Sequence, residues 1–583
     1  MRLALLAGAC ALAAPATAQN DISWLTLDMD QARMVSAPHL GVNDVQEKDY
    51  AWADLDKDGW TDLVVVRKEP FTTAGRFPNV LFMNEGGTLV DRTTEYASAS
   101  DVNGDSGFLT PTNDRDVVIA DVDGDTWLDV VTAPTISPGH PKHISHPRVY
   151  MNLGNDGNGD WLGLFFEDAR TPDHGTFPTY CGVGAGDVTG NGKPDLYFAH
   201  YDSGAEFDLN DRLLVNDGTG VFTDETAARL TSNMTASFFG SAATMVDLNG
   251  DGVQDVVDGE SGVVNLIYND PDNEGFFDIL HNPYFGAPYH VTPGDLNRDG
   301  KPDLLISDDA QDRYMLNEGN DGLGRVIWSS PHTYNTDDGF ASNNLAVDMN
   351  GDGWAEALYC DVDVDIPGCS RRFHLFHNRG GAVGGFVDLH EESGGGSVGA
   401  TGLSAPTITG AHDVAAFDID NDGDKDMVLG RCSGTQVYMN GLNEPVGTRF
   451  CDPSVPNSTG APGMISASGS DVVADNDVTL TALNLPPNKA GYFLASMTQG
   501  FIQNPGGSQG NLCLQGAGRY APQIMSSGPE GIISLQIDLD SVPQPGGAVA
   551  VVPGETWSFT LWHRDKNPGQ TSNFTDGVAI PFQ

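Results

Sequence analysis

An acidic loop of one design occurs seven times along this chain, and its residues have the chemistry to hold a metal cation. Counting from the first residue, oxygen-bearing side chains occupy positions 1, 3, 5 and 9, and Gly occupies position 6 in every copy but the second. Oxygen atoms at alternating positions around a Gly turn are how a chain wraps a hard cation such as Ca²⁺. The pattern predicts calcium sites in loops that begin at Asp54, Asp121, Asp187, Asp247, Asp295, Asp348 and Asp418.

The twelfth position of the loops excludes the most familiar calcium motif. An EF-hand needs a bidentate Glu there, with a helix on each side of the loop. Six of the seven residues at that position have no carboxylate, and Asp258 is the exception. The seven are Val65, Thr132, Phe198, Asp258, Ile306, Tyr359 and Leu429. Tandem nonapeptide calcium repeats are excluded too, because the copies start 48 to 70 residues apart.

The segments around each loop predict strands. Every loop runs into a short apolar stretch such as LVVV or LLIS, which is typical of a buried strand. Each repeat then has an apolar triplet ending in Asn, usually followed by Gly, which favours a hairpin turn. These residues are Asn84, Asn152, Asn216, Asn269, Asn317, Asn378 and Asn440.

Each repeat therefore reads as four antiparallel strands, and seven such units predict an all-β, seven-bladed β-propeller. A propeller must close its ring, because its first and last blades would otherwise expose strand edges. We expect residues 22–27 (ISWLTL), which precede the first repeat, to supply the outer strand of the last blade.

Two recurring motifs, the acidic loop and the Asn turn, resemble those of FG-GAP (VCBS-type) repeats, found in integrin α-subunit propellers and many secreted bacterial proteins. The resemblance covers roughly residues 45–440. It implies side-chain ligands at positions 1, 3, 5 and 9 and a main-chain carbonyl at position 7. In the first two loops the implied ligands are Asp54, Asp56, Asp58, Asp62 and the Trp60 carbonyl, then Asp121, Asp123, Asp125, Asp129 and the Trp127 carbonyl. In the third to fifth loops they are Asp187, Thr189, Asn191, Asp195; Asp247, Asn249, Asp251, Asp255; and Asp295, Asn297, Asp299, Asp303. In the last two they are Asp348, Asn350, Asp352, Glu356; and Asp418, Asp420, Asp422, Asp426.

Two copies depart from this pattern. Thr126 replaces Gly at position 6, where the main chain usually needs a positive φ, so this turn is expected to be strained. The third loop has only two carboxylates, because its positions 3 and 5 are Thr189 and Asn191. Since ligand charge tunes calcium affinity, we predict that this site is the weakest.

The periodicity stops near Phe450, and the sequence predicts three parts: a signal peptide at 1–18, the propeller at 19–450 and a β-sandwich at 451–583. Runs such as DVTLTALNL and TWSFTLW alternate apolar and polar residues, as half-buried strands do. Trp557, Phe559 and Leu561 read as sandwich core rather than as a sugar platform. This region is similar to modules at the ends of large secreted proteins of planctomycete-like bacteria, which implies a Cys451–Cys513 disulfide and leaves the module's role open.

The first residues predict export. Arg2, an apolar stretch from Leu3 to Ala14 and an A-x-A site at 16–18 are typical of a secretory signal peptide cleaved after Ala18. Cys10 lies too early, and in the wrong context, for a lipoprotein. The six later cysteines favour disulfides in an exported chain, and Cys360 and Cys369, which flank one short loop, are the expected pair.

Charge excludes two classes of partner. Asp and Glu number 81 against 29 Lys and Arg, and such a surface repels nucleic acid and anionic lipid. Up to seven structural Ca²⁺ would neutralise part of the excess. No stretch reaches the roughly 20 apolar residues of a membrane-spanning helix, so membrane insertion is not expected.

No catalytic constellation stands out. Residues 395–399 match G-x-S-x-G, but they lie in a Gly-rich run rather than between a strand and a helix. His140, His143 and His146 favour a solvated loop over a transition-metal site, because they have no close acidic partner and are flanked by Pro141 and Pro147.

The sequence thus predicts a secreted, calcium-loaded propeller that acts as an extracellular binding or adhesion protein for a protein or glycan partner. The alternative is a polysaccharide-processing enzyme, a lyase or hydrolase, with a cluster of His, Arg, Lys or Tyr at the inner ends of the strands. A third possibility is a passive cell-surface component anchored through the C-terminal module.

Overall fold

The computed structural model describes residues 27–35, 44–69, 75–175, 179–201, 210–235, 240, 242–260, 262–334, 340–351, 353–362, 371–383, 386–391, 403, 408–441, 446–451, 454–476, 478–520, 523–528, 531–567 and 569–583. Over these residues the protein is all-β. The described helices are the single turns α1 (Thr93–Tyr96), α2 (Lys142–Ser145) and α3 (Thr226–Arg229) and five short 3₁₀ segments. None of them is long and apolar enough to cross a membrane.

Seven sheets of four or five strands carry one acidic loop each, between their first and second strands. From the innermost strand outward, the first sheet is β3 (Glu47–Ala53), β4 (Asp62–Lys68), β5 (Val80–Asn84), β6 (Leu89–Asp91) and β2 (Met34–Val35). The second is β8 (Asp114–Ala120), β9 (Asp129–Pro134), β10 (Arg148–Asn152), β11 (Leu164–Phe166) and β7 (Ala99–Ser100). The third is β12 (Tyr180–Gly186), β13 (Asp195–His200), β14 (Arg212–Asn216) and β15 (Phe222–Asp224).

The fourth sheet is β16 (Ala242–Val246), β17 (Asp255–Glu260), β18 (Val263–Asn269) and β19 (Phe277–Tyr284). The fifth is β20 (Pro288–Gly294), β21 (Asp303–Asp308), β22 (Arg313–Met315) and β25 (His332–Thr333), with a hairpin of β23 (Asn317–Asn320) and β24 (Val326–Trp328). The sixth is β26 (Phe340–Val347), β27 (Glu356–Val362), β28 (His374–Val383) and β29 (Phe386–Glu391). The seventh is β30 (Ala411–Phe417), β31 (Asp426–Arg431), β32 (Gly434–Asn440) and β1 (Leu27–Met29).

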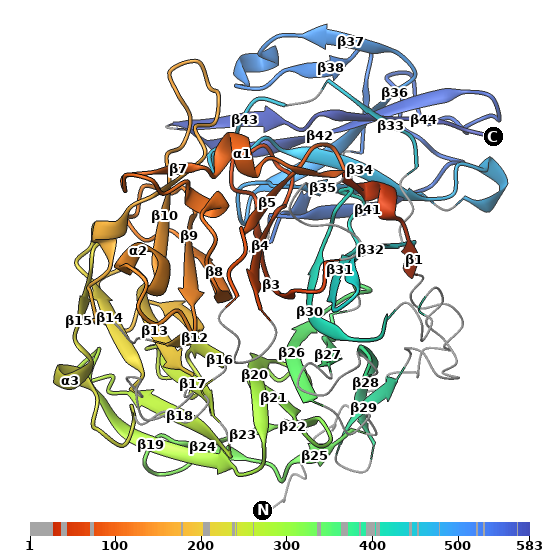
Figure 1. Cartoon of the computed structure of the whole chain (residues 1–583). Helices are drawn as coiled ribbons and strands as arrows, with labels where there is room; N and C mark the ends of the chain where they lie inside the picture. The colour runs from red at the N-terminus through yellow and green to blue at the C-terminus, as the bar shows by residue number, and fades with distance from the viewer. Residues whose placement is uncertain are drawn as a thin grey trace, which may run out of the picture.

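The sheets form a propeller-like arrangement in which their innermost strands face a common centre (Figure 1). Each innermost strand packs against that of the next sheet, and β3 packs against both β8 and β30. Apolar second strands fill the space between sheets: Val64, Val65 and Val66 of β4 are fully buried. Because both faces of these strands are covered, their runs are continuously apolar rather than alternating.

The outer strand of the seventh sheet comes from the N-terminal part of the chain. In β1, Leu27 pairs with Asn440 and Met29 with Tyr438. The strand begins at the last residue of the predicted segment, and residues 22–26 lie outside the described part.

A second set of sheets follows the repeats. It comprises β33 (Thr448–Phe450), β34 (Met464–Gly469), β35 (Val478–Leu483), β36 (Ala490–Ser496), β37 (Gln499–Ile502), β38 (Leu512–Leu514), β39 (Gly518–Arg519), β40 (Met525–Ser526), β41 (Ile533–Ile537), β42 (Thr556–Lys566), β43 (Gln570–Phe574) and β44 (Gly577–Pro581). A sheet built on β36, β42 and β44 packs on the sheet β34–β35–β41 through one hydrophobic core. Trp557, Phe559 and Leu561 are fully buried in that core, as predicted.

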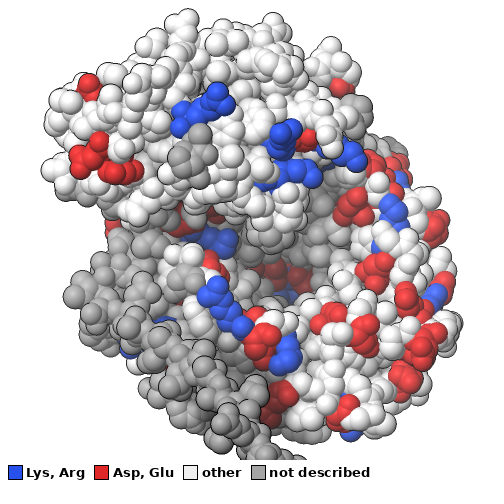
Figure 2. All heavy atoms as spheres, turned by 180° about the vertical axis from the view of Figure 1, so that it is seen from behind, with Lys and Arg blue, Asp and Glu red and all other residues white. Residues whose placement is uncertain are grey.

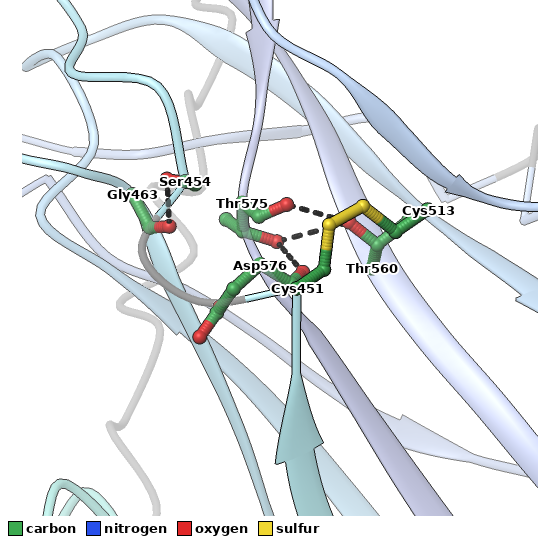
Figure 3. Close-up of a disulfide and its surroundings, with 7 residues drawn as sticks. All are labelled: Cys451, Ser454, Gly463, Cys513, Thr560, Thr575 and Asp576. Atoms are coloured by element: carbon green, nitrogen blue, oxygen red, sulfur yellow. Dashed lines mark hydrogen bonds between the residues drawn. A yellow bond between two sulfur atoms is a disulfide. The ribbon is translucent and has the colours of Figure 1, made fainter. Parts of the chain in front are cut away.

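The cysteines confirm one predicted disulfide and correct another. Cys451 and Cys513 are bonded, with Cα atoms 6.3 Å apart (Figure 3). The predicted Cys360–Cys369 pair is wrong, because Cys360 is a free thiol buried in strand β27, where its side chain joins the apolar core. Cys432 is disulfide-bonded, Cys181 is free and buried, and Cys369 lies outside the described residues.

Candidate functional site: the acidic loops and the cavities between sheets

The first residue of each acidic loop fixes the turn that follows it. In the first loop, Asp54 Oδ2 accepts a hydrogen bond from the Gly59 main-chain N–H at 3.0 Å. The same bond from the position-6 N–H to position 1 forms in all seven loops, at 2.7 to 3.0 Å. Position 5 accepts from the N–H of position 7, as Asp58 does from Trp60 at 2.8 Å. These N–H groups fold the loop around its own oxygen atoms, and a carboxylate oxygen that accepts one hydrogen bond keeps a second lone pair for a metal.

The ninth residue joins the loop to its own sheet. Asp62 Oδ2 accepts from the Leu55 N–H at position 2, and Asp62 Oδ1 accepts from the Asn84 N–H on the third strand, both at 2.9 Å. Both contacts recur in the other six repeats. The carboxylate at position 9 is therefore buried and connects the loop to the third strand of its sheet, and it is also a candidate metal ligand.

The recurrent Asn joins each sheet to its neighbour. Asn152 Nδ2 donates to the Leu55 carbonyl of the preceding loop at 2.8 Å. Every repeat makes this contact to position 2 of the preceding loop, with the acceptors Leu55, Val122, Val188, Leu248, Leu296, Met349 and Ile419. The sequence marked the Asn as a turn residue, and its contact across sheets was not predicted.

Main-chain conformation in the loops agrees with the predicted Gly requirement. Position 6 has a positive φ in all seven loops, 79° at Thr126 and 80° to 103° at the glycines. Thr126 is thus a β-branched residue in the left-handed region, as expected from its place in the pattern. Position 4 also has a positive φ throughout, even where it is Lys57, Arg298 or Asn421.

Within the described part of the chain, three loops bring three carboxylates together so that one oxygen of each lies within 4.8 Å of the others. The groups are Asp54, Asp56, Asp58; Asp121, Asp123, Asp129; and Asp418, Asp420, Asp426. Burial, and then the charge of Asp56, raises the pKa of Asp54 to about 7. Burial likewise raises the pKa of Asp255 to about 8 and that of Asp303 to about 7. Such carboxylates are costly as bare anions, and a bound cation would reverse the effect.

The third loop has the sparse donor set that its sequence predicts. Asn191 Oδ1 accepts from the Lys193 N–H at 2.8 Å, and the Thr189 hydroxyl is buried beside the Asp195 carboxylate. In the sixth loop, Asp352 lies outside the described residues. Asp348 Oδ2 still accepts from the Gly353 N–H at 2.8 Å.

The other sequence candidates do not assemble into sites. His146 is buried, and both of its ring nitrogens have hydrogen-bond partners, Ser145 Oγ and the His174 N–H, at 3.0 and 2.9 Å. It is therefore unavailable to a metal beside His140 and His143, and it is not in the solvated loop expected from the sequence. The G-x-S-x-G run at 395–399 lies outside the described residues.

The innermost strands enclose a polar cavity of about 270 Å³ that sequence reasoning missed. Its polar lining includes Asp49, Asp116, His290, Asn343 and Asp413, and Asn343 Nδ2 donates to Asp49 at 2.8 Å. Each of the five residues lies five positions before the first residue of its acidic loop. This shared position could have predicted that they lie together. Figure 2 shows acidic side chains over the repeats and a hollow at their centre.

A buried ion network lies beside this cavity. Glu47 pairs with Lys68 at 2.7 Å and with Arg115 at 3.2 Å, and the Arg115 guanidinium lies 5.3 Å from the centre of the Tyr289 ring. His412 is buried next to these charges. These residue types are the ones expected of an enzyme at the inner strands, but Glu47, Lys68, Arg115 and His412 are each at most 5% exposed. The network is closed to a polymeric substrate.

A larger pocket of about 710 Å³ lies between the fifth and sixth sheets. Its wall is aromatic: the His332 and Phe386 rings meet edge to face at 4.2 Å, and His332 lies 4.8 Å from Tyr314. Phe386 is 47% exposed. Glu391, at the same pocket, accepts from His374 Nδ1 at 2.9 Å and pairs with Arg372. An open aromatic surface beside a carboxylate suits a ligand with both apolar and hydroxyl groups.

Comparison with known proteins supports the repeats. The family model described as FG-GAP-like repeat matches residues 187–257 and 295–359. No curated relative with significant sequence similarity was found. One similar solved structure is an Agrocybe aegerita lectin described as recognising non-reducing terminal N-acetylglucosamine, with 16% identity, 59% of this chain and 80% of that chain covered, and a TM-score of 0.37. Another is a Lactobacillus plantarum protein, with 12% identity, 61% and 86% covered, and a TM-score of 0.36.

With TM-scores this low, the two structures say nothing about this chain's ligand. The repeats themselves rest on the family match and on the loop geometry above. The chain carries FG-GAP-like repeats in an all-β, propeller-like fold.

Proposed function

We propose that this protein is a secreted, calcium-stabilised, seven-bladed β-propeller that binds a carbohydrate ligand outside the cell. The observation that carries the binding role is the aromatic pocket between the fifth and sixth sheets.

The seven sheets are the blades of a closed ring. Each Asn turn contacts the loop of the preceding sheet, and Asn84 of the first sheet contacts Ile419 of the last at 2.8 Å. Strand β1 adds an N-terminal strand to the last sheet, so that the two ends of the repeat array share one sheet. Such pairing protects the strand edges that an open array would expose.

Calcium occupies up to seven loops and is structural. The ions neutralise the clustered carboxylates and hold each turn between its two strands. The donor set is all oxygen, which suits Ca²⁺ rather than a transition metal. The third loop, with two carboxylates, is the weakest site.

Export is supported by the signal-peptide pattern at 1–18 and by the Cys451–Cys513 disulfide. Disulfides persist in oxidising compartments, where millimolar calcium is also common. The C-terminal domain rests on the first and seventh loops: Arg449 lies 5.1 Å from the centre of the Trp60 ring, and Asn421 Nδ2 lies 3.9 Å from the Met464 sulfur. We propose that this domain braces the junction of the ring and that cell-surface attachment, if any, passes through it.

The ligand is a carbohydrate because the pocket combines two kinds of surface. The exposed face of Phe386 and the ring of His332 offer aromatic area to the C–H face of a sugar. Glu391, His390, Ser330 and Thr333 offer hydrogen-bonding groups for hydroxyls at its edge. A pocket of about 710 Å³ has the size of a small-molecule site, whereas a protein partner would need a wide contact surface.

A glycan array in millimolar Ca²⁺ tests this function, followed by titration of the best glycan against variants. Phe386→Ala should weaken binding at least tenfold, because it removes the exposed aromatic face. Phe501→Ala is the matched control, since Phe501 is 66% exposed on the C-terminal domain. If Phe386→Ala binds glycan as tightly as the wild type, the pocket is not the binding site.

The second candidate is a polysaccharide lyase or hydrolase that uses the central cavity. The observation in its favour is the pair Asp49 and Asp413, which line that cavity with raised pKa values, about 6 for Asp49, caused mainly by burial. Against it, Asp413 Oδ2 accepts from the Tyr50 N–H at 2.8 Å, which is a bracing contact between neighbouring inner strands. Release of reducing ends from polysaccharides by the wild type, abolished in Asp413→Asn, would favour the enzyme over the binding protein.

A further inference from the structure

A second kind of acidic cluster lies away from the seven loops. Asp211, Asp258 and Glu260 place one carboxylate oxygen each within 4.8 Å of the others. Asp211 precedes β14 in the third sheet, and Asp258 and Glu260 lie on one face of β17 in the fourth. Strands β13 and β17 contact each other at this boundary (Figure 1). The cluster is therefore buried between two sheets.

Its position separates it from the acidic loops. The loop of the fourth sheet ends at Asp255, and Asp258 and Glu260 follow three and five residues later on the same strand. At about 3.3 Å per residue, they lie on the order of 10 to 16 Å from that loop. An ion held here would be distinct from an ion in the loop of the fourth sheet.

Asp258 breaks the repeat pattern in a way that calls for a compensating charge. The equivalent residue in the other six sheets is Val65, Thr132, Phe198, Ile306, Tyr359 or Leu429, so this is a core position. Asp258 is nevertheless fully buried, as is Asp211, and Glu260 is 4% exposed. Three carboxylates this close and this buried cannot all remain charged without a cation or shared protons.

Groups outside the cluster hold the carboxylates in place. Asp211 accepts from the His200 N–H at 2.8 Å and from the Tyr197 hydroxyl at 3.1 Å. Asn265 Nδ2 donates to Asp258 Oδ2 at 3.1 Å, and Asn282 Nδ2 donates to Asn265 Oδ1 at 2.6 Å, which fixes the orientation of the Asn265 amide. Partners of this kind are what orient the ligands of a metal site.

One oxygen of the cluster receives no hydrogen bond from an N–H group or a hydroxyl of the described residues. This oxygen, Asp258 Oδ1, is completely buried, and the Glu260 carboxyl is a close neighbour of Asp258. The orientation of Asp258 Oδ1 is set by the bond that Asn265 makes to the other oxygen. A buried carboxylate oxygen left open in this way points to a ligand that is not part of the chain.

We propose that Asp211, Asp258 and Glu260 bind an additional divalent cation of the size of Ca²⁺. Each Ca–O distance is about 2.3 to 2.6 Å, so three oxygens that lie within 4.8 Å of one another can all reach one such ion. Mg²⁺ usually keeps several of its waters, which suits this buried cluster less well. This ion links the third and fourth sheets, as the Asn contact between Asn269 and Val188 does at the loop end.

Anomalous diffraction near the calcium edge, from wild-type crystals grown in 10 mM CaCl₂, tests the site directly. An anomalous peak among Asp211, Asp258 and Glu260 is expected. Its absence at a well-ordered cluster overturns the proposal and leaves shared protons as the explanation. Peaks in the acidic loops of the same crystal report on the loop ions separately, so the two proposals can fail independently.

Calcium stoichiometry gives a second test in solution. Asp258→Asn combined with Glu260→Gln should lower the calcium content per chain by one ion, measured by mass spectrometry after desalting. Asp308→Asn is the control, because Asp308 is a buried carboxylate at the Glu260 position of the neighbouring sheet and is not part of the cluster. An unchanged calcium content in the double variant overturns the proposal. If the double variant does not fold, the wild-type anomalous map decides.

Discussion

Asn84 donates a hydrogen bond from its side-chain amide to the main-chain carbonyl of Ile419, 2.8 Å away, although 335 residues separate them. Both residues are buried, at the boundary between the first and seventh sheets. Arg33 bridges the same boundary, with hydrogen bonds to the Gly87 carbonyl at 2.9 Å and to Asp420 at 3.3 Å. The two ends of the repeat array are thus joined by the same contact that joins consecutive sheets.

Asn84→Ala should destabilise the protein by about 1 to 3 kcal/mol, because it leaves the buried Ile419 carbonyl without its donor. Chemical denaturation in millimolar Ca²⁺ measures the change. Asn269→Ala is the matched control, since Asn269 makes the same contact between sheets that are consecutive in sequence. If the ring is closed, the two variants lose similar stability. A loss below about 0.5 kcal/mol in Asn84→Ala alone would mean that the first and last sheets are not held together this way.

Removal of calcium should lower the melting temperature. Each loop that binds Ca²⁺ at 100 times its Kd adds about 2.7 kcal/mol to the folded state, and the bare carboxylates repel one another when the ion leaves. Differential scanning calorimetry with and without a chelator, followed by re-addition of Ca²⁺, checks this. An identical melting temperature in both conditions would show that the acidic loops are not structural metal sites.

Thr189→Asp should strengthen the third site. The substitution gives this loop a third carboxylate at position 3, where the Thr189 hydroxyl is buried beside Asp195. Titration calorimetry is expected to show one site tightened by about tenfold or more, since affinity follows ligand charge. Thr189→Val, with nearly the same shape and no oxygen, serves as the control. Equal calcium affinities in all three proteins would contradict the assignment of Thr189 as a ligand.

Local sequence rules predict much of this fold. The features that they do not predict depend on contacts between residues far apart in the chain. The loop pattern predicts the positive φ at Thr126, because the main chain needs that conformation whichever side chain is present. The loop pattern does not predict the hydrogen bond from the Asn152 side chain to the Leu55 carbonyl, because the sequence of one repeat does not indicate how two neighbouring sheets pack against each other. Spacing alone predicts a Cys360–Cys369 disulfide, yet the Cys360 side chain packs in the apolar core as a free thiol. The polar lining of the central cavity is not predicted by any single repeat, because its residues come from different repeats and share only their position five residues before the loop.

Acid should destabilise the protein through His412. Burial lowers its pKa to about 3, so the folded state keeps this imidazole neutral, whereas the unfolded chain protonates it near 6.5. A lowered folded-state pKa gives stability that is fully present above about 6.5 and is lost as pH falls towards 3, by up to about 1.4 kcal/mol per pH unit. The difference in unfolding free energy between pH 7.5 and pH 5 should therefore shrink by about 2 kcal/mol in His412→Phe. His390→Gln, at a half-exposed histidine, is the control. The same pH dependence in His412→Phe and wild type would exclude this group as the cause.

Thr126→Gly should stabilise the second loop. Thr126 has φ 79°, a conformation that a β-branched residue adopts at a cost of about 1 to 2 kcal/mol and that Gly adopts freely. The substitution also removes the exposed hydrogen bond from Lys57 Nζ to Thr126 Oγ1, 2.9 Å long, which offsets only a small part of the gain. We expect a net gain of about 1 kcal/mol in chemical denaturation and tighter binding of Ca²⁺ by this loop. Thr126→Ala separates the two effects, because it loses the hydroxyl while keeping the Cβ atom in the strained conformation. If Ala stabilises the protein as much as Gly does, the main-chain strain at position 6 is not what limits this loop.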